Sequence, residues 1–91
     1  MRALSMDRTN AIALLEIAQL RFDAEDYARS EEYYGVYRAV VKKQSSRALW
    51  LGIRLARISG ERDAEGSYAL VLSNLYPQSP EYQAYQRERQ E

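Results

Sequence analysis

The 91-residue sequence contains no cysteine and no histidine. The lack of cysteine excludes disulfides, thiolate zinc sites and cysteine nucleophiles. The lack of histidine removes the commonest general base near neutral pH and the commonest metal ligand in proteins. Only carboxylate pairs, or serine with lysine, remain as catalytic material. We therefore expect a protein that is not an enzyme and that holds no cofactor and no metal.

The sequence also has no excess of positive or negative charge, and it has no long apolar run. The 13 basic residues balance the 13 acidic residues, which leaves no long-range attraction for nucleic acid or for an anionic membrane. The most apolar stretch, residues 49–53, is far shorter than the roughly 20 residues that a bilayer requires. The first residues lack the pattern of a signal peptide. We expect no nucleic-acid partner, no direct membrane insertion by this segment and no targeting signal within it.

Glycine occurs 4 times and proline 2 times, whereas good helix formers such as alanine, leucine, arginine and glutamate are abundant. This composition predicts an all-α fold. The three- and four-residue spacing of apolar side chains predicts about five helices, over 10–23, 27–43, 47–59, 61–76 and from 79–80 towards the C-terminus. Asn10, the serines of the polar break Gln44-Ser45-Ser46, and Ser79 suit helix starts, and Gly60 suits a helix end.

The sequence aligns with itself after a shift of 34 residues, so that Ala18 falls on Gly52 and Tyr34 falls on Tyr68. Two helices per 34 residues is the pattern of the tetratricopeptide repeat (TPR), whose helix-turn-helix units stack in a right-handed superhelix. The alternative is two unrelated hairpins that share a spacing, but chance periodicity does not require small residues such as Ala18 and Gly52 at matching positions. The period divides the chain into the end of a preceding second helix with its linker (1–10), two repeats (11–44 and 45–78) and a C-terminal capping helix (79–91).

We expect from this register that the chain is a piece of a longer repeat array. A repeat face without a neighbour leaves apolar surface uncovered. The N-terminal face of the first helix pair is therefore expected to be exposed, or to be covered by a second copy of the chain in a homo-oligomer.

A more specific pattern runs through the second half of the chain. Leu51-Gly52-Ile53-Arg54 is followed by Arg62-Asp63 with Ser67-Tyr68, then by Leu75-Tyr76-Pro77 and Glu81-Tyr82-Gln83. This order resembles the C-terminal part of the PilF/PilW family of type IV pilus biogenesis proteins. The resemblance implies a lipid-anchored TPR array at the periplasmic side of the outer membrane, a pilotin that promotes localisation and assembly of the pilus secretin. No lipobox cysteine is present in this chain, so we expect the lipid anchor to lie outside it.

TPR arrays bind partners through a concave face lined by the first helix of each repeat. The predicted partner-binding residues are Ile12, Leu15, Gln19 and Phe22 in the first repeat, and Leu49, Trp50, Ile53 and Arg57 in the second. This strip is largely apolar and suits an apolar helix or strand of a partner. It lacks the Lys, Asn and Arg set of the TPR clamp for the C-terminal carboxylate of heat-shock proteins. The alternative is that the strip is covered by the chain's own fifth helix or by further repeats.

Two further features leave alternatives open. Trp50 is either a partly exposed binding hot spot or packs against the fifth helix near Tyr82. The basic residues Arg47, Arg54 and Arg57 either meet an acidic partner or pair with acidic residues of the next helix, such as Glu61, Asp63 and Glu65.

The acidic turn of Asp23, Glu25 and Asp26 lacks the additional oxygen ligands and the glycine of a calcium loop. We expect it to complement the dipole at the start of the second helix.

The sequence thus predicts a non-catalytic TPR scaffold whose partner is the pilus secretin or another pilus assembly protein. A TPR adaptor of another bacterial envelope complex is the alternative, and an enzyme with paired carboxylates is the third class considered.

Overall fold

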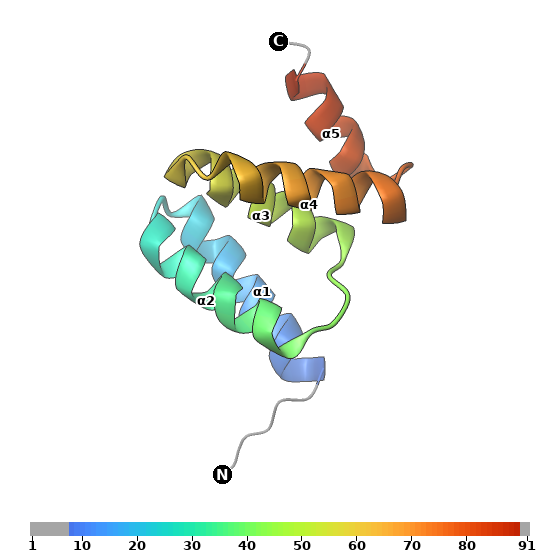
Figure 1. The fold of residues 1–91 in the computed structure, drawn as a ribbon. Coiled ribbons are helices and arrows are strands. Elements are labelled where there is room, and N and C mark those ends of the chain that lie inside the picture. The colour runs from blue at the N-terminus through green and yellow to red at the C-terminus, as the bar shows by residue number, and fades with distance from the viewer. Residues whose placement is uncertain (1–7, 90–91) are drawn as a thin grey trace. The chain divides into compact units, whose positions relative to one another are not determined.

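The computed structural model describes residues 8–89, which form five α-helices and, within that range, no strand (Figure 1). The all-α class and the number of helices predicted from the sequence are confirmed. The chain consists of two compact units that divide between Lys43 and Gln44. The first unit holds α1 (Arg8–Asp23) and α2 (Tyr27–Val40), and the second holds α3 (Ser46–Ser59), α4 (Arg62–Leu75) and α5 (Pro80–Arg89).

Side-chain and glycine caps fix several of the helix ends. The Ser45 hydroxyl accepts the backbone N–H of Ala48 at 3.2 Å at the start of α3. The Ser79 hydroxyl accepts the N–H of Tyr82 at 3.1 Å, directly before Pro80 at the first position of α5. Gly60 ends α3 with φ 79°, a left-handed conformation that a residue without Cβ adopts at little cost.

The acidic turn between α1 and α2 serves as a helix cap. The Asp26 carboxylate accepts the backbone N–H of Arg29 at 3.4 Å and lies 3.7 Å from its guanidinium. Within residues 8–89, no three acidic side chains gather in a way that could hold a metal ion. Asp26 thus caps the start of α2, and the dipole-complementing role of Glu25 and Asp26 stays a prediction.

Two predicted limits are wrong. Asn10 does not cap α1, because α1 begins at Arg8 and residues 8–10, assigned to the linker of a preceding repeat, belong to the helix. α2 ends at Val40 rather than at Lys43, with Val41 in an extended conformation. Two consecutive β-branched residues, Val40 and Val41, disfavour a further helical turn there. The rest of the predicted preceding helix, residues 1–7, lies outside the described residues.

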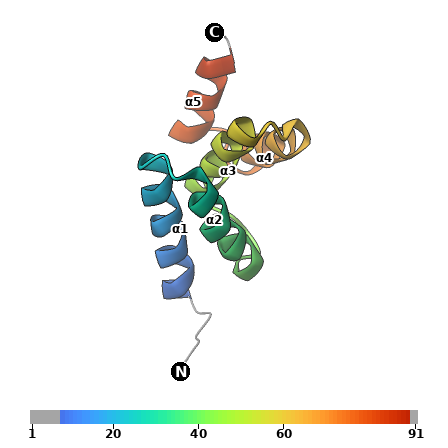
Figure 2. The same ribbon diagram turned by 90° about the vertical axis from the view of Figure 1, so that its left-hand side faces the viewer.

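In the first unit, α1 and α2 lie side by side as an antiparallel hairpin in both views of the ribbon (Figures 1 and 2). The small residues Ala18 on α1 and Ser30 on α2 are fully buried, and the Ser30 hydroxyl donates a hydrogen bond of 2.7 Å to the Ala18 carbonyl oxygen. The two helices thus approach each other closely where the sequence places small residues. The buried side chains of α1 are Ala11, Leu15, Ala18 and Phe22.

In the second unit, α3 and α4 form the second hairpin, and α5 packs against both of them. The core of this unit joins Leu49 and Ile53 of α3 to Ala69 and Leu72 of α4. Partly buried aromatic side chains surround this core, namely Trp50, Tyr68, Tyr76, Tyr82 and Tyr85. Tyrosine suits this position because its ring is buried while its hydroxyl reaches a polar partner. The Tyr76 hydroxyl, for example, donates to the Gln44 carbonyl oxygen at 2.8 Å.

Candidate partner-binding surface

The predicted strip on α1 is only partly open to a partner. Ile12 is 62% exposed, whereas Leu15 and Phe22 are buried. The Phe22 ring meets the Tyr27 ring edge to face, with centroids 5.2 Å apart. The half-buried Gln19 donates a hydrogen bond of 3.0 Å to the Asp23 carboxylate. In this unit, Ile12 and Gln19 are therefore the members of the predicted set that a partner reaches directly.

The apolar residues of the predicted strip on α3 are covered from within the chain. Leu49 and Ile53 are 1% and 0% exposed. Tyr82 and Tyr85 of α5 pack against the core that these two residues form with α4. Of the two alternatives that the sequence leaves open, the structure shows the one in which the fifth helix covers this part of the strip.

Trp50 is half-buried and contacts α5. Its ring meets the Tyr85 ring edge to face with centroids 6.5 Å apart, and Tyr85 in turn stacks on Tyr82 at 6.3 Å. The guanidinium carbons of Arg54 and Arg57 lie 5.8 and 5.6 Å from the centre of the Trp50 ring, within the range of cation–π attraction. The expected contact with the fifth helix is present, with Tyr85 rather than Tyr82 as the direct ring partner.

Arg57 joins all three helices of the second unit. Its Nε donates to the Glu65 carboxylate of α4 at 2.9 Å, and its Nη1 forms a short ion pair with the Glu88 carboxylate of α5. Burial acts to lower the pKa of the Arg57 guanidinium, but the hydrogen bonds and negative charges of the two glutamates outweigh it and raise that pKa. Arg57 is thus paired inside the unit, as the sequence predicts for Glu65.

The contacts of α5 follow one order along α3. Ser46 donates to Glu81 at 3.0 Å, Trp50 meets Tyr85, and Arg57 pairs with Glu88. Because the partners occur in the same order on both helices, α5 runs along α3 in the same general direction. Sequence reasoning missed the partners Glu81 and Glu88. The signal was the 34-residue period, which assigns residues 79–91 the place of a first helix stacked on residues 45–59.

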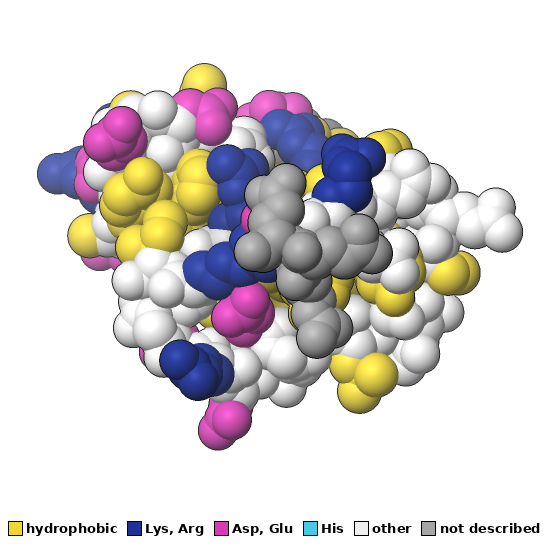
Figure 3. All heavy atoms as spheres, turned by 90° about the horizontal axis from the view of Figure 1, so that it is seen from above, with side chains coloured by type: hydrophobic (Ala, Val, Ile, Leu, Met, Phe, Trp, Pro, Cys, Tyr) yellow, Lys and Arg dark blue, Asp and Glu magenta, His cyan; other side chains and the backbone are white. Residues whose placement is uncertain are grey.

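The part of the surface seen in Figure 3 mixes positive and negative side chains rather than separating them. None of the described helices is long and apolar enough to span a bilayer. Seven large apolar side chains stand exposed across the described residues: Ile12, Leu20, Val36, Ile58, Leu70, Val71 and Leu75. Apart from Ile12, sequence reasoning assigned none of them to a binding surface. These exposed apolar side chains offer surface for protein contact.

Comparisons of the sequence and of the structure with known proteins both find a similarity to the same protein. No family model matches the sequence. The chain is 39% identical over 88 residues to the type IV pilus assembly protein PilF of Pseudomonas aeruginosa, an alignment that covers 97% of this chain and 34% of PilF. A solved structure from the functional characterization of Pseudomonas aeruginosa PilF matches with a TM-score of 0.82 and 40% identity, over 86% of this chain and 35% of that one. The chain thus spans about a third of the length of the relatives that it matches.

Proposed function

Since the chain is a relative of PilF over nearly its whole length, we propose that it acts as a non-catalytic TPR scaffold in type IV pilus assembly. The observation that carries this proposal is the 39% identity over 97% of the chain. That span includes both hairpins and most of α5, so the likeness is not confined to one repeat-like motif. The lack of histidine and cysteine supports a role in binding rather than in catalysis.

The finer form of the proposal is a pilotin-like role. In this role the protein binds the pilus secretin, or another pilus assembly protein, at the periplasmic side of the outer membrane and promotes localisation and assembly of the secretin ring. The hairpin of α1 and α2 and the hairpin of α3 and α4 act as two successive TPR units, with α5 as the cap of the second. A TPR binds by presenting a rigid helix surface, so its function requires intact packing more than any single reactive group.

We assign partner contact in the first unit to the accessible members of the α1 strip, Ile12 and Gln19. Leu15 and Phe22 are buried and hold α1 in its position. In the second unit, α5 covers Leu49 and Ile53, and these residues position Trp50 and Arg57 at the edge of the α3–α5 contact. A partner meets this edge together with the outer side of α5. The buried leucine and isoleucine are unsuitable for testing binding, because a charge placed there would unfold the unit.

The proposal is tested by co-purification of the chain with the pilus secretin. We expect the secretin to be recovered with the unaltered protein and its recovery to fall with Ile12→Asp. Ile58→Asp is the matched control, because Ile58 is also an exposed isoleucine but lies outside the predicted strip. Circular dichroism should show that both variants stay folded. Equal recovery with Ile12→Asp and the unaltered chain would contradict the assigned surface.

Deletion of the gene separates the pilus role from that of an adaptor for another envelope complex. We expect the deletion strain to lose surface pili and to lose multimeric secretin from its outer membrane. If pili and secretin multimers stay at their normal level in the deletion strain, the pilus role is wrong and the adaptor alternative holds.

A further inference from the structure

α5 covers an apolar surface of α3, which we call the α5-docking surface. It is formed by Leu49 and Ile53, which are 1% and 0% exposed, with Trp50 at its edge. Tyr82 and Tyr85 of α5 pack against the core to which Leu49 and Ile53 belong. An apolar helix stripe of this kind receives a second amphipathic helix. In this chain α5 is that second helix, so the strength of its attachment decides whether another helix can take its place.

α5 is attached through one side only. Between Pro80 and Glu88, none of its side chains is buried as fully as those that α3 and α4 contribute to the core, and its two tyrosines are its only aromatic side chains. The opposite side carries Gln83, Gln86 and Arg87, which are polar and exposed. Within this range α5 therefore has no second apolar face that a further helix would cover, and its limited burial follows from its own residues.

The polar contacts of α5 can be released without leaving a buried charge unpaired. Glu81 accepts a hydrogen bond of 3.0 Å from the Ser46 hydroxyl, and Glu88 pairs with Arg57 although its side chain is 49% exposed. Water replaces a glutamate at such an exposed position, so the pair contributes little to holding the helix. Arg57 also keeps its hydrogen bond of 2.9 Å to Glu65 of α4 when Glu88 leaves. The α3–α4 hairpin thus stays internally paired without α5.

We propose that α5 is an exchangeable cover, which leaves the α5-docking surface while α3 and α4 stay packed, and that a helix of a partner protein takes its place. α5 itself defines the chemistry of that helix. The helix has two aromatic side chains three residues apart, one carboxylate directly before the first and another three residues after the second, and it runs in the direction of α3. This site is separate from the edge of the α3–α5 contact assigned above, because it is accessible only when α5 has left.

The cover makes the site selective. Because α5 is tethered to the surface that it covers, its effective concentration there is high, and a partner helix must bind more tightly than α5 to displace it. An apolar helix without the matching carboxylates gains nothing from Ser46 and Arg57 and stays below this threshold.

Hydrogen exchange tests whether α5 opens separately from its unit. Amides of residues 84–88 should exchange about tenfold or more faster than the core amides of α3 and α4, because α5 opens without them. Tyr85→Ala should accelerate exchange in α5 about tenfold further and leave α3 and α4 unchanged. Equal exchange in all three helices, or an equal acceleration of all three in the variant, would overturn the proposal.

A synthetic peptide of residues 79–89 is the probe for the uncovered surface. The peptide contains no tryptophan, so the emission of Trp50 in the full chain reports its binding. The apparent affinity is reduced by the fraction of chains in which α5 is in place, so Tyr85→Ala in the chain should tighten peptide binding about tenfold. Glu88→Gln is a milder second variant and should tighten it about threefold. Gln83→Ala, on the exposed side of α5, should leave it unchanged. Equal affinity of all four chains for the peptide would overturn the exchange.

Altered peptides test the chemistry of the partner helix, with the Tyr85→Ala chain as the receptor. Glu88→Arg in the peptide should weaken binding about tenfold, because it places a second cation beside Arg57. Gln83→Arg introduces the same residue on the exposed side and should bind as the unaltered peptide does. If the two arginine peptides bind equally well, the surface does not read the carboxylate, and the proposed pattern is wrong.

Discussion

The Ser30 hydroxyl on α2 donates a hydrogen bond of 2.7 Å to the carbonyl oxygen of Ala18 on α1, and neither residue is exposed to solvent. A buried hydroxyl without a partner is costly, so this bond fixes the register of the two helices as well as their distance. The small size of both residues predicts from the sequence that the helices approach closely. The hydrogen bond cannot be predicted in this way, because it requires the two helices to be aligned to within a fraction of a helical turn.

Ser30→Ala should therefore lower the free energy of unfolding by about 1 kcal/mol, the ordinary net value of such a hydrogen bond. Ser30→Leu should cost about 2 kcal/mol or more, because the larger side chain forces the helices apart. Urea denaturation followed by circular dichroism measures both. Ser67→Ala, at an exposed helical serine, is the control for the higher helix propensity of alanine. A Ser30→Ala variant as stable as the unaltered protein would mean that the hydroxyl contributes nothing.

The ion pairs of Arg57 with Glu65 and Glu88 should contribute to the stability of the second unit. Arg57→Met keeps most of the aliphatic stem but removes the charge that Glu65 and Glu88 share. We expect a loss of about 1–2 kcal/mol, below that of a fully buried pair, because the Arg57 side chain is 30% exposed. The stability of Arg57→Lys should lie between those of the unaltered protein and Arg57→Met, since lysine keeps the charge but lacks the planar guanidinium fork that meets both glutamates. Arg62→Met, at an exposed arginine, should change stability by less than about 0.5 kcal/mol.

The raised pKa of Arg57 sets the pH window of this contribution. A cation whose pKa is higher in the folded state stabilises fully below its pKa in the unfolded chain and loses this effect only as the pH rises through the folded value. Both values are strongly alkaline. The stability difference between the protein and Arg57→Met should therefore stay constant from neutral to mildly alkaline pH and shrink with added salt. A difference that disappears within this pH range would contradict the assignment.

Trp50 is the single tryptophan and reports on the position of α5. Tyr85→Ala should shift its fluorescence emission to longer wavelength, because the ring loses its cover and meets water. Gln83→Ala, on an exposed side of the same helix, should leave the emission unchanged. If Tyr85→Ala leaves both the emission maximum and the quenching by acrylamide unaltered, Trp50 does not pack on α5 in solution.

The local features of this fold follow from the sequence, whereas the pairings between helices largely do not. Ser45, Gly60 and Ser79 cap their helices because each cap depends on a few neighbouring residues. The same local rule fails at Asn10, since a capping residue type is also tolerated inside a helix.

Contacts between residues far apart in the sequence depend on how one helix is placed on another, and no rule based on neighbouring residues predicts that placement. The Arg57–Glu88 pair depends on how α5 is seated on α3, to within about one helical turn. Leu49 illustrates the limit for the candidate site, because an apolar residue on a helix has the same pattern whether a partner or the chain's own α5 covers it. The burial of Leu49 by α5 follows only from the position of α5 in the structure.

The glycines give a pair of opposite predictions. Gly60→Ala should lose about 1 kcal/mol of stability, because alanine is strained at a φ of 79° even though no atom lies in the way of its Cβ. Gly66→Ala should gain about 0.5–1 kcal/mol, because Gly66 lies within α4 and open space surrounds the added Cβ. Thermal denaturation compares the two variants directly. A gain from both substitutions would show that Gly60 does not hold the left-handed conformation in solution.

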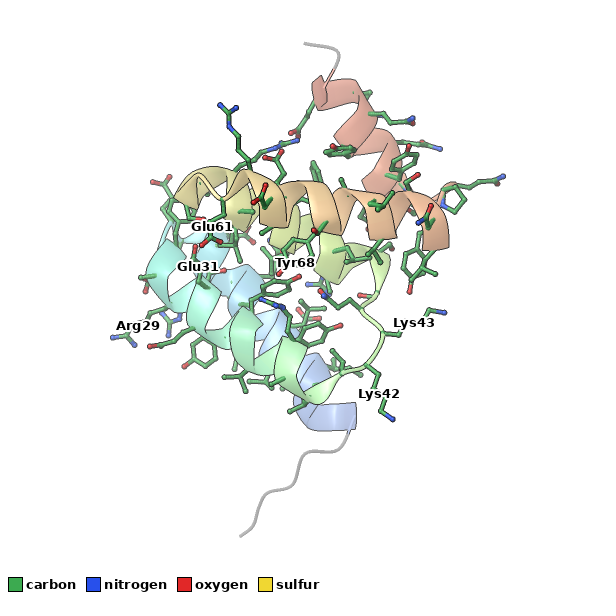
Figure 4. All side chains as sticks on the ribbon, viewed as in Figure 1. Arg29, Glu31, Lys42, Lys43, Glu61 and Tyr68 are labelled. Atoms are coloured by element: carbon green, nitrogen blue, oxygen red, sulfur yellow. The ribbon has the colours of Figure 1, made fainter. Side chains whose placement is uncertain are left out.

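Lys42 and Lys43 are the only lysines and project from the segment that joins α2 to α3 (Figure 4). A lysine-specific protease should therefore cut the folded protein only there and release the α1–α2 hairpin from the three-helix unit. Each unit has its own core, so we expect the fragment 44–91 to keep its helical circular dichroism and the Trp50 emission of the intact protein. Lys42→Arg together with Lys43→Arg should abolish cleavage without altering the spectrum. Loss of the helical signal from the purified fragment would show that α3, α4 and α5 depend on the first unit to stay folded.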